Sequence, residues 1–315
     1  VPRDGEINIS ITSVEKTEIE NTAIIPAPLT TVRDGGEDVE FFISDDFYSR
    51  DISYPDSIYE ISDGGIMRDF RIQAVTFYPV TYNPVRNSVE IATDIRFDVN
   101  VSGGNFIDSG NENKVSESFL PFYKKYLSNP ELLDNVEPER GKYWIITHDD
   151  FYIDLVTSGF TEWKNRKGFE VVVTNLSEIS SNPTYQNIRE YMRDQYNNWE
   201  VKPDYVLLVG DINMPGNKRF PALHYYHNDP NPNYSGDGVS DSYYSFLEGD
   251  DYFPDVMLGR FPVNNAAELE TVIYKTLSYE KDCYLDETDW YTRAAVSAGQ
   301  SANPWYNNFI SSRLT

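Results

Sequence analysis

The sequence predicts two parts of different fold class: an all-β, sandwich-like part over residues 1–140 and an α/β part with a parallel sheet over residues 141–315. The first part is rich in β-branched and aromatic residues, and clusters of Gly, Asn and Asp interrupt these runs at short intervals. In the second part, short apolar segments alternate with segments whose apolar residues follow helical spacing. That alternation is typical of a parallel sheet with helices on both faces.

Strands are expected in the first part at residues 39–46, 69–82 and 88–103. The alternation in the last of these predicts one apolar face formed by Ile95, Phe97, Val99 and Val101. A short helix is expected within residues 116–130. The polar segment 131–144, which contains a proline, is the best candidate for a linker between the two parts.

The second part is expected to contain strands at residues 143–147, 170–176, 205–209, 254–263 and 290–299, and helices at residues 152–169, 181–199 and 264–282. Functional loops gather where parallel strands end. We therefore expect His148, Asp149, Asp150, Gly210 and Asp211 to share one edge of the sheet with residues 299–303. The helical pattern within residues 303–315 stops early, which predicts that this is the N-terminal portion of a longer protein.

Composition excludes several classes of function. The net charge of −25 disfavours nucleic acid and anionic membrane surfaces as partners, because both require basic residues. No run of about 18 apolar residues is present, so no membrane-spanning helix is expected. A single cysteine, Cys283, permits no intrachain disulfide. The N-terminus has no apolar signal region, so any export peptide is expected to have been removed.

Common catalytic and cofactor motifs are missing. The sequence contains no GxGxxG or GxxxxGK[ST] after a strand and no GxSxG elbow. Cys283 is surrounded by acidic residues, which oppose thiolate formation, so we interpret it as an idle thiol. His224 and His227 are expected in a loop, where two histidines alone are weak support for a metal site. A further hypothesis is a hydrolase that uses Asp149, Asp150 and Asp211 at the sheet edge as paired carboxylates, but no motif supports it.

An acidic stretch, "SDSYYSFLEGDDYFPDVMLGRFP" at residues 240–262, offers a second candidate site. Carboxylates in a turn-rich loop suit Ca²⁺, although the order of an EF-hand loop is not met. The candidate ligands are Asp241, Asp250, Asp251 and Asp255. The alternative is that they are turn residues that shape the loop, with Arg260 either paired with one of them or exposed.

Several motifs together resemble the gingipain-type cysteine peptidases. They are "FTEWKNRKGFEVVV", "DYVLLVGDINMP", the acidic stretch with its closing "GRF", and "YE" before Lys281, within about residues 142–300. The first part also resembles the propeptide of that family, through "FYPVTYNPVRNSVEI" and "SFLPFYKKYL".

The resemblance implies a caspase-like α/β domain and a catalytic Cys/His dyad. The dyad of the family follows the matched region, so no catalytic residue is assigned within residues 1–315 and the dyad is expected beyond them. In the family, the loop after the strand matching "AAVSAG" contacts the substrate. This implies that Ser301, Asn303 and Trp305 bind substrate here, whereas the arginine-specific members have an Asp in this loop.

The resemblance also implies a zymogen. Family propeptides end in a basic residue that blocks the active site and is then cleaved, so Arg140–Gly141 is the expected processing junction. The alternative is that Arg140 is an ordinary charged residue of an exposed linker. We therefore expect a secreted cysteine endopeptidase precursor that is inactive as this chain alone. Its partners would be peptide substrates and the C-terminal half of its own catalytic domain. The alternative is a secreted, non-catalytic binding scaffold with the same fold.

Overall fold

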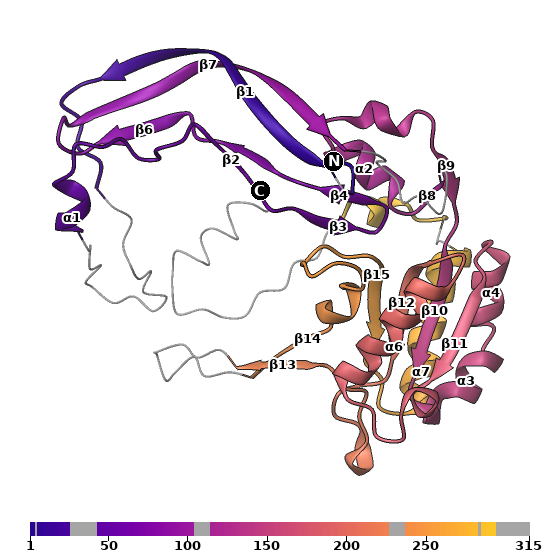
Figure 1. Cartoon of the computed structure of the whole chain (residues 1–315). Coiled ribbons are helices and arrows are strands. Elements are labelled where there is room, and N and C mark those ends of the chain that lie inside the picture. Colours follow the sequence, from indigo (N-terminus) through magenta and orange to yellow (C-terminus); the bar gives the residue numbers. More distant parts are fainter. Residues whose placement is uncertain (4, 26–42, 104–113, 227–236, 283–284, 294–315) are drawn as a thin grey trace. The chain divides into compact units, whose positions relative to one another are not determined.

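The computed structural model describes residues 1–3, 5–25, 43–103, 114–226, 237–282 and 285–293 (Figure 1). The chain divides into two compact units that alternate along the sequence. The first, here called the larger unit, comprises Val1–Ile7, Asp63–Gln73 and Val101–Leu285, and the second comprises Asn8–Ser62, Ala74–Asn100 and Asp286–Thr315. The predicted boundary between residues 140 and 141 remains a prediction.

A four-stranded parallel sheet forms the centre of the larger unit. Its strand order is β11-β10-β12-β15, with β10 at Lys142–Thr147, β11 at Val171–Asn175, β12 at Pro203–Val209 and β15 at Met257–Phe261. Thr147 pairs with both Asn175 and Val209, so these three strands end at the same level. The predicted α/β class is confirmed, and residues 240–256 form the last part of the connection between β12 and β15, two adjacent strands of one sheet.

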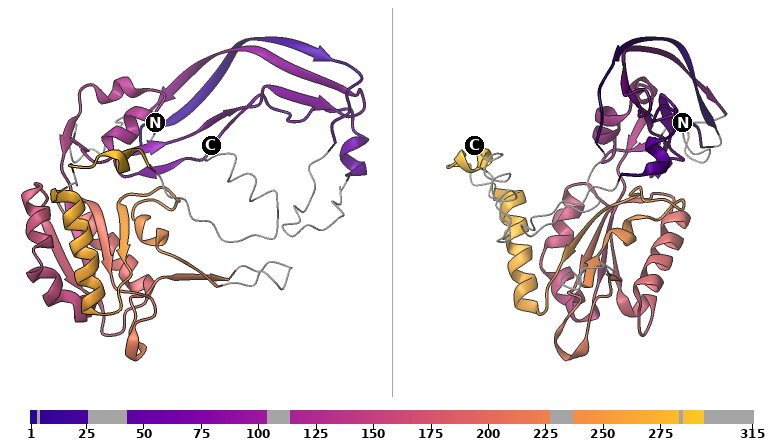
Figure 2. Two further views of the ribbon diagram at one scale, coloured as in Figure 1. Left: turned by 180° about the vertical axis from the view of Figure 1, so that it is seen from behind. Right: turned by 90° about the vertical axis from the view of Figure 1, so that its left-hand side faces the viewer.

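Both faces of the sheet are buried, because successive strand residues point to opposite sides. Ile145 and Leu207 belong to one core cluster, whereas Trp144 and Ile146 belong to the other. Figure 2 shows α6 and α7 on opposite sides of the sheet. The helices are α3 (Tyr152–Thr157), α4 (Phe160–Arg166), α5 (Leu176–Ile179), α6 (Tyr185–Asn198) and α7 (Ala266–Asp282), with short 3-10 turns at Asp149–Phe151, Pro215–Asn217 and Ser242–Ser245.

Several local predictions were wrong. Asp45 and Asp46, expected at the end of a strand, begin a helical turn, and residues 290–292, expected to begin a strand, lie in a 3-10 turn. The single strand expected over residues 69–82 is three short strands. The single helix expected over residues 152–169 is two helices, because Gly159 adopts a left-handed conformation with φ of 79° and separates α3 from α4. The loop expected around His224 is partly a strand, β13 (Leu223–Tyr226), which pairs antiparallel with β14 (Asp237–Ser240). The sequence around His224 does not show this pairing, because the partner strand β14 lies further along the chain.

A third core cluster in the larger unit surrounds a two-stranded hairpin. The hairpin consists of β3 (Gly65–Met67) and β4 (Phe70–Ile72). Its core cluster includes Phe119, which directly precedes α2 (Leu120–Tyr126), and Tyr123 within that helix. The expected linker contains the 3-10 turn Pro130–Leu133 and β9 (Glu137–Glu139). Because β9 pairs in parallel with β8 (Lys114–Ser116), this segment is tied to the preceding chain.

The second unit consists mainly of antiparallel strands. One sheet has the strand order β1-β7-β6, with β1 at Glu6–Ile19, β7 at Ser88–Ser102 and β6 at Val80–Asn83. A separate pair consists of β2 (Tyr59–Ile61) and β5 (Val75–Phe77). The helical turns are α1 (Asp45–Tyr48) and Asp289–Thr292. On the predicted apolar face of β7, Phe97 packs against Phe77 with ring centroids 4.6 Å apart. Phe97, Val99 and Val101 on that face are all exposed, so the predicted apolar face is not a buried one at these positions. Within the described residues, no helix is long and apolar enough to span a membrane.

Packing of α6 against the sheet gives a direct test of the fold. Ile188 is fully buried, whereas Ile153 on α3 is 66% exposed. We expect Ile188→Ala to lower the free energy of unfolding by about 2–5 kcal/mol, because it removes buried methyl groups and leaves a cavity. The same substitution at Ile153 should change it by less than about 0.5 kcal/mol. Urea denaturation of both variants measures this, and equal losses would contradict the assigned face of α6.

Candidate functional site

The carboxyl edge of the sheet collects the loops expected there. His148 follows β10, and its backbone N–H donates to Val209 O at the end of β12. Asp149 accepts a hydrogen bond from the backbone N–H of Ser177 at 3.2 Å, and Asp150 pairs with Lys218. Each carboxylate is bound by its own donor. The loops after β10 and β12 thus lie at one edge as predicted, and residues 299–303 lie outside the described residues. These contacts do not join the acids into a catalytic pair.

Asp211 shapes the next loop of the same edge. Its carboxylate accepts hydrogen bonds from the backbone N–H of Ile212 at 2.6 Å and from the side-chain amide of Asn264 at 3.2 Å. A cavity of about 800 Å³ lies beside this loop and the first turn of α6, lined by residues that include Thr184, Tyr185, Met214, Arg219 and His224. This edge therefore has both the polar loops and the space that a ligand site in a parallel sheet requires.

The acidic stretch is held by its own donors. Asp241 forms a two-point ion pair with Arg260 of β15, at 2.6 and 2.7 Å. The same guanidinium donates to Gly210 O at 2.7 Å and lies over the ring of Phe220. Of the two alternatives for Arg260, the structure shows the paired one. The pair ties the stretch to the end of β12, next to the functional edge.

Asp255 is fully buried and accepts three backbone hydrogen bonds. The donors are the N–H groups of Arg68 at 2.9 Å and of Leu247 and Glu248 at 2.7 Å each. Burial raises the pKa of Asp255 to about 6, although the three hydrogen bonds act to lower it. Asp255 thus organises the turn by accepting from backbone groups that would otherwise be unsatisfied.

The other two candidate calcium ligands differ from each other. Asp251 accepts from the N–H groups of Ile66 at 2.8 Å and Phe253 at 2.7 Å, whereas the side chain of Asp250 is exposed. Among the described residues, no three His, Cys, Asp or Glu side chains are grouped so that they could hold a metal ion. The structure gives Asp241, Asp251 and Asp255 a structural role, and Ca²⁺ binding remains an untested prediction.

The expected processing junction lies between β9 and β10. Arg140 forms a two-point ion pair with Glu117, at 2.7 and 2.9 Å, and donates to Lys167 O at 2.7 Å. Gly141 is buried, and its N–H donates to Asp204 at 3.0 Å. A Cβ at this position would lie 2.4 Å from the Asp204 carboxylate, so the close approach requires glycine.

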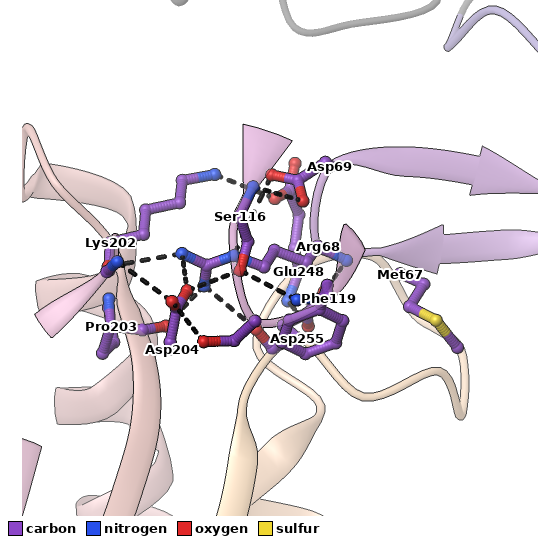
Figure 3. Close-up of polar contacts among 12 residues, drawn as sticks. Met67, Arg68, Asp69, Ser116, Phe119, Lys202, Pro203, Asp204, Glu248 and Asp255 are labelled. Atoms are coloured by element: carbon purple, nitrogen blue, oxygen red, sulfur yellow. Dashed lines mark hydrogen bonds and ion pairs between the residues drawn. The ribbon is translucent and has the colours of Figure 1, made fainter. Parts of the chain in front are cut away.

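A buried ion pair next to this junction was not predicted. Arg68, at the tip of the β3–β4 hairpin, lies 2.7 Å from the carboxylate of Asp204 at the start of β12 (Figure 3). The sequence did contain a signal, since an acid at the start of an otherwise apolar buried strand needs a partner. Its partner could not be identified from the sequence, because it lies in the other predicted part. The remaining site predictions, at Cys283, His227, Ser301, Asn303 and Trp305, lie outside the described residues.

Two family profiles match the chain in sequence order. The propeptide profile Propeptide_C25 matches residues 1–125, and the profile of peptidase family C25 matches residues 136–314. Gingipain R2 of Porphyromonas gingivalis is 27% identical over 307 residues, which cover 96% of this chain and 39% of the relative. Lys-gingipain of the same organism is 26% identical over 299 residues, which cover 89% of this chain and 16% of the relative. The chain thus spans well under half the length of these relatives.

Solved structures of the same group are also similar. The Arg-specific cysteine proteinase gingipain R is 28% identical, with a TM-score of 0.36 and coverage of 44% of this chain and 28% of that chain. A complex of the pro- and mature domains of Porphyromonas gingivalis RgpB has the same identity and TM-score, and covers 44% of this chain and 29% of that chain.

The raised pKa of Asp255 predicts a specific pH dependence of stability. Between its unfolded pKa near 3.8 and its folded pKa of about 6, the folded state holds the proton more tightly. The contribution of the protonated Asp255 carboxyl to the free energy of unfolding is therefore complete at low pH and is lost as the pH rises through about 6. The free energy of unfolding of the wild type minus that of Asp255→Asn is therefore expected to fall by up to about 3 kcal/mol between pH 4 and pH 7. Urea denaturation across this range measures it, and a constant difference would contradict the assignment.

Proposed function

The chain belongs to peptidase family C25, and on this premise we propose that the complete protein is the precursor of a cysteine endopeptidase. In this proposal, residues 1–125 contribute to a prosegment and residues 136–314 begin the peptidase domain. The observation that carries the proposal is the occurrence of both family matches, in this order, on one chain. The cavity and polar loops at the carboxyl edge of the sheet are compatible with a substrate site there.

The reaction would be hydrolysis of a peptide bond through an acyl-enzyme. A cysteine thiolate attacks the carbonyl carbon, and the amine leaves with a proton donated by histidine. Water, deprotonated by the same histidine, then releases the acid and restores the thiol. We place this dyad in the part of the protein beyond residue 315. The role of the described residues is to build the sheet edge on which the dyad would act.

We propose that residues 1–315 by themselves are inactive. Among the described residues, the histidines are His148 and His224, and there is no cysteine among them. We further propose that the protein is secreted and that its partners are peptide substrates and the second half of its peptidase domain. Ser301, Asn303 and Trp305 remain the proposed substrate-binding residues.

The proposed processing bond, Arg140–Gly141, is restrained on both sides. Arg140 is tied to Glu117 and Lys167, and the N–H of Gly141 donates to a buried carboxylate. A peptidase needs several residues around the bond in an extended, accessible form. Processing would therefore require local release of β9 and of the hydrogen bond between Gly141 and Asp204.

Peptidase activity of the complete protein is the first test. We expect the full-length product to hydrolyse peptide substrates and to lose this activity on alkylation with iodoacetamide, because the nucleophile is a thiolate. The chain of residues 1–315 should show no hydrolysis. Cys283→Ser in the full-length product should remain active and equally sensitive to alkylation. A full-length, folded and processed protein without activity would favour the non-catalytic scaffold.

Processing at Arg140 is the second test. We expect the maturing full-length protein to acquire a new N-terminus at Gly141, detected by N-terminal sequencing. Arg140→Gln should accumulate the unprocessed form. Arg166→Gln is the control, because Arg166 is an exposed arginine whose ion pair with Glu162 lies on the surface of α4. A new N-terminus elsewhere, or normal processing of Arg140→Gln, would show that the junction is wrongly placed.

A further inference from the structure

The tip of the β3–β4 hairpin places a buried arginine against the edge of the sheet opposite to the substrate loops. Arg68 is 5% exposed, and Asp204 beside it is fully buried. The β3–β4 pairing leaves only Arg68 and Asp69 in the turn. Asp204 and its neighbours lie where β12 begins, so the arginine approaches the amino edge.

The two terminal nitrogens of Arg68 meet four acceptors. Nη1 donates to Pro203 O and, at 3.3 Å, to Asp255 O. Nη2 donates to Lys202 O at 3.3 Å and lies 2.7 Å from Asp204 Oδ1. All four acceptors belong to the segment that matches the peptidase profile, whereas Arg68 belongs to the segment that matches the propeptide.

The residues on the other side of the guanidinium come from the prosegment. Phe119 lies with its ring centroid 5.6 Å from the guanidinium carbon, and Asp69 lies 3.9 Å from Nε. Figure 3 shows the side chain of Arg68 reaching between these groups toward Asp204. The prosegment therefore supplies and covers the cation, and the peptidase segment supplies the acceptors.

The backbone of Arg68 indicates that the side chain is required for these contacts. Its φ is 49°, a left-handed conformation that favours glycine and is uncommon for arginine. A residue that is unfavourable for its turn persists where the surrounding contacts compensate for it. The acceptors also match arginine in particular, because a planar fork can donate from two nitrogens at once, whereas an ammonium is a single point charge.

We propose that residues 202–204 and 255 form a guanidinium-binding site on the peptidase segment, and that Arg68 is its intramolecular ligand. The chemical class of ligand is an alkylguanidinium, such as the side chain of a peptide arginine. The site holds the prosegment hairpin through charge and hydrogen-bond geometry. It lies at the amino edge of the sheet and is distinct from the loops proposed to bind substrate, so it does not depend on peptidase activity.

Chemical rescue in the chain of residues 1–315 tests the proposal. Arg68→Gly removes the side chain without straining the left-handed backbone, and it retains the N–H that donates to Asp255. We expect this variant to melt about 5 °C or more below the wild type. N-propylguanidinium at millimolar concentration should raise its melting temperature saturably, because it replaces the missing part of the side chain. It should not raise that of the wild type.

The controls separate a specific site from a general effect. Propylammonium at equal concentration and ionic strength should not rescue Arg68→Gly, and propylguanidinium should not rescue the double variant Arg68→Gly/Asp204→Asn. Arg68→Lys should melt below the wild type although it retains the charge. The proposal is wrong if both ligands rescue equally, if propylguanidinium fails to rescue, or if Arg68→Lys is as stable as the wild type. If Arg68→Gly does not fold, refolding yield with each ligand replaces the melting temperature, with the same expected order.

Discussion

The buried carboxylate of Asp204, at the start of a central strand, is the constraint on which the organisation of the larger unit depends. Its Oδ1 lies 2.7 Å from both the guanidinium of Arg68 and the hydroxyl of Ser116. Its Oδ2 accepts from the hydroxyl of Ser118 at 2.8 Å and from the N–H of Gly141 at 3.0 Å. A buried ion pair is weak support for stability, but a buried carboxylate that loses its partner is costly. Every segment that contributes a donor is therefore held at this point.

The acidic stretch that resembles a metal loop has a different physical role. Asp241 pairs with Arg260, and Asp255 accepts from three backbone N–H groups, so these acids are already engaged by protein donors. The acidic stretch, one of the motifs that resemble the family, thus fixes the connection between β12 and β15. Asp255 also receives the backbone of Arg68, which links this connection to the prosegment hairpin.

The two ends of the parallel sheet have separate tasks in the proposed precursor. The carboxyl end carries the loops after His148 and Gly210 and the adjoining cavity, as expected for a substrate site. The amino end carries the contacts between prosegment and peptidase segment. The Arg140–Gly141 bond lies beside them, before β10 begins, and so at the end opposite to the loops that a residue blocking the substrate site would reach. Because these contacts lie at the end opposite to the proposed substrate loops, we expect that the affinity for the prosegment and the chemistry on substrate can be altered independently.

Local signals in the sequence predicted the α/β class, strands at residues 143–147 and 205–209, and a helix over the residues of α6, because continuous apolar runs and helical periodicity are local. The sequence also determined which loops share the carboxyl edge, since parallel strands fix their polarity. Tertiary structure alone decided the partners of Arg68, Asp204 and Asp255. A buried charge shows in the sequence only as an isolated polar residue in or beside an apolar segment. Its partner is set by the approach of segments far apart in the chain, which no local pattern records.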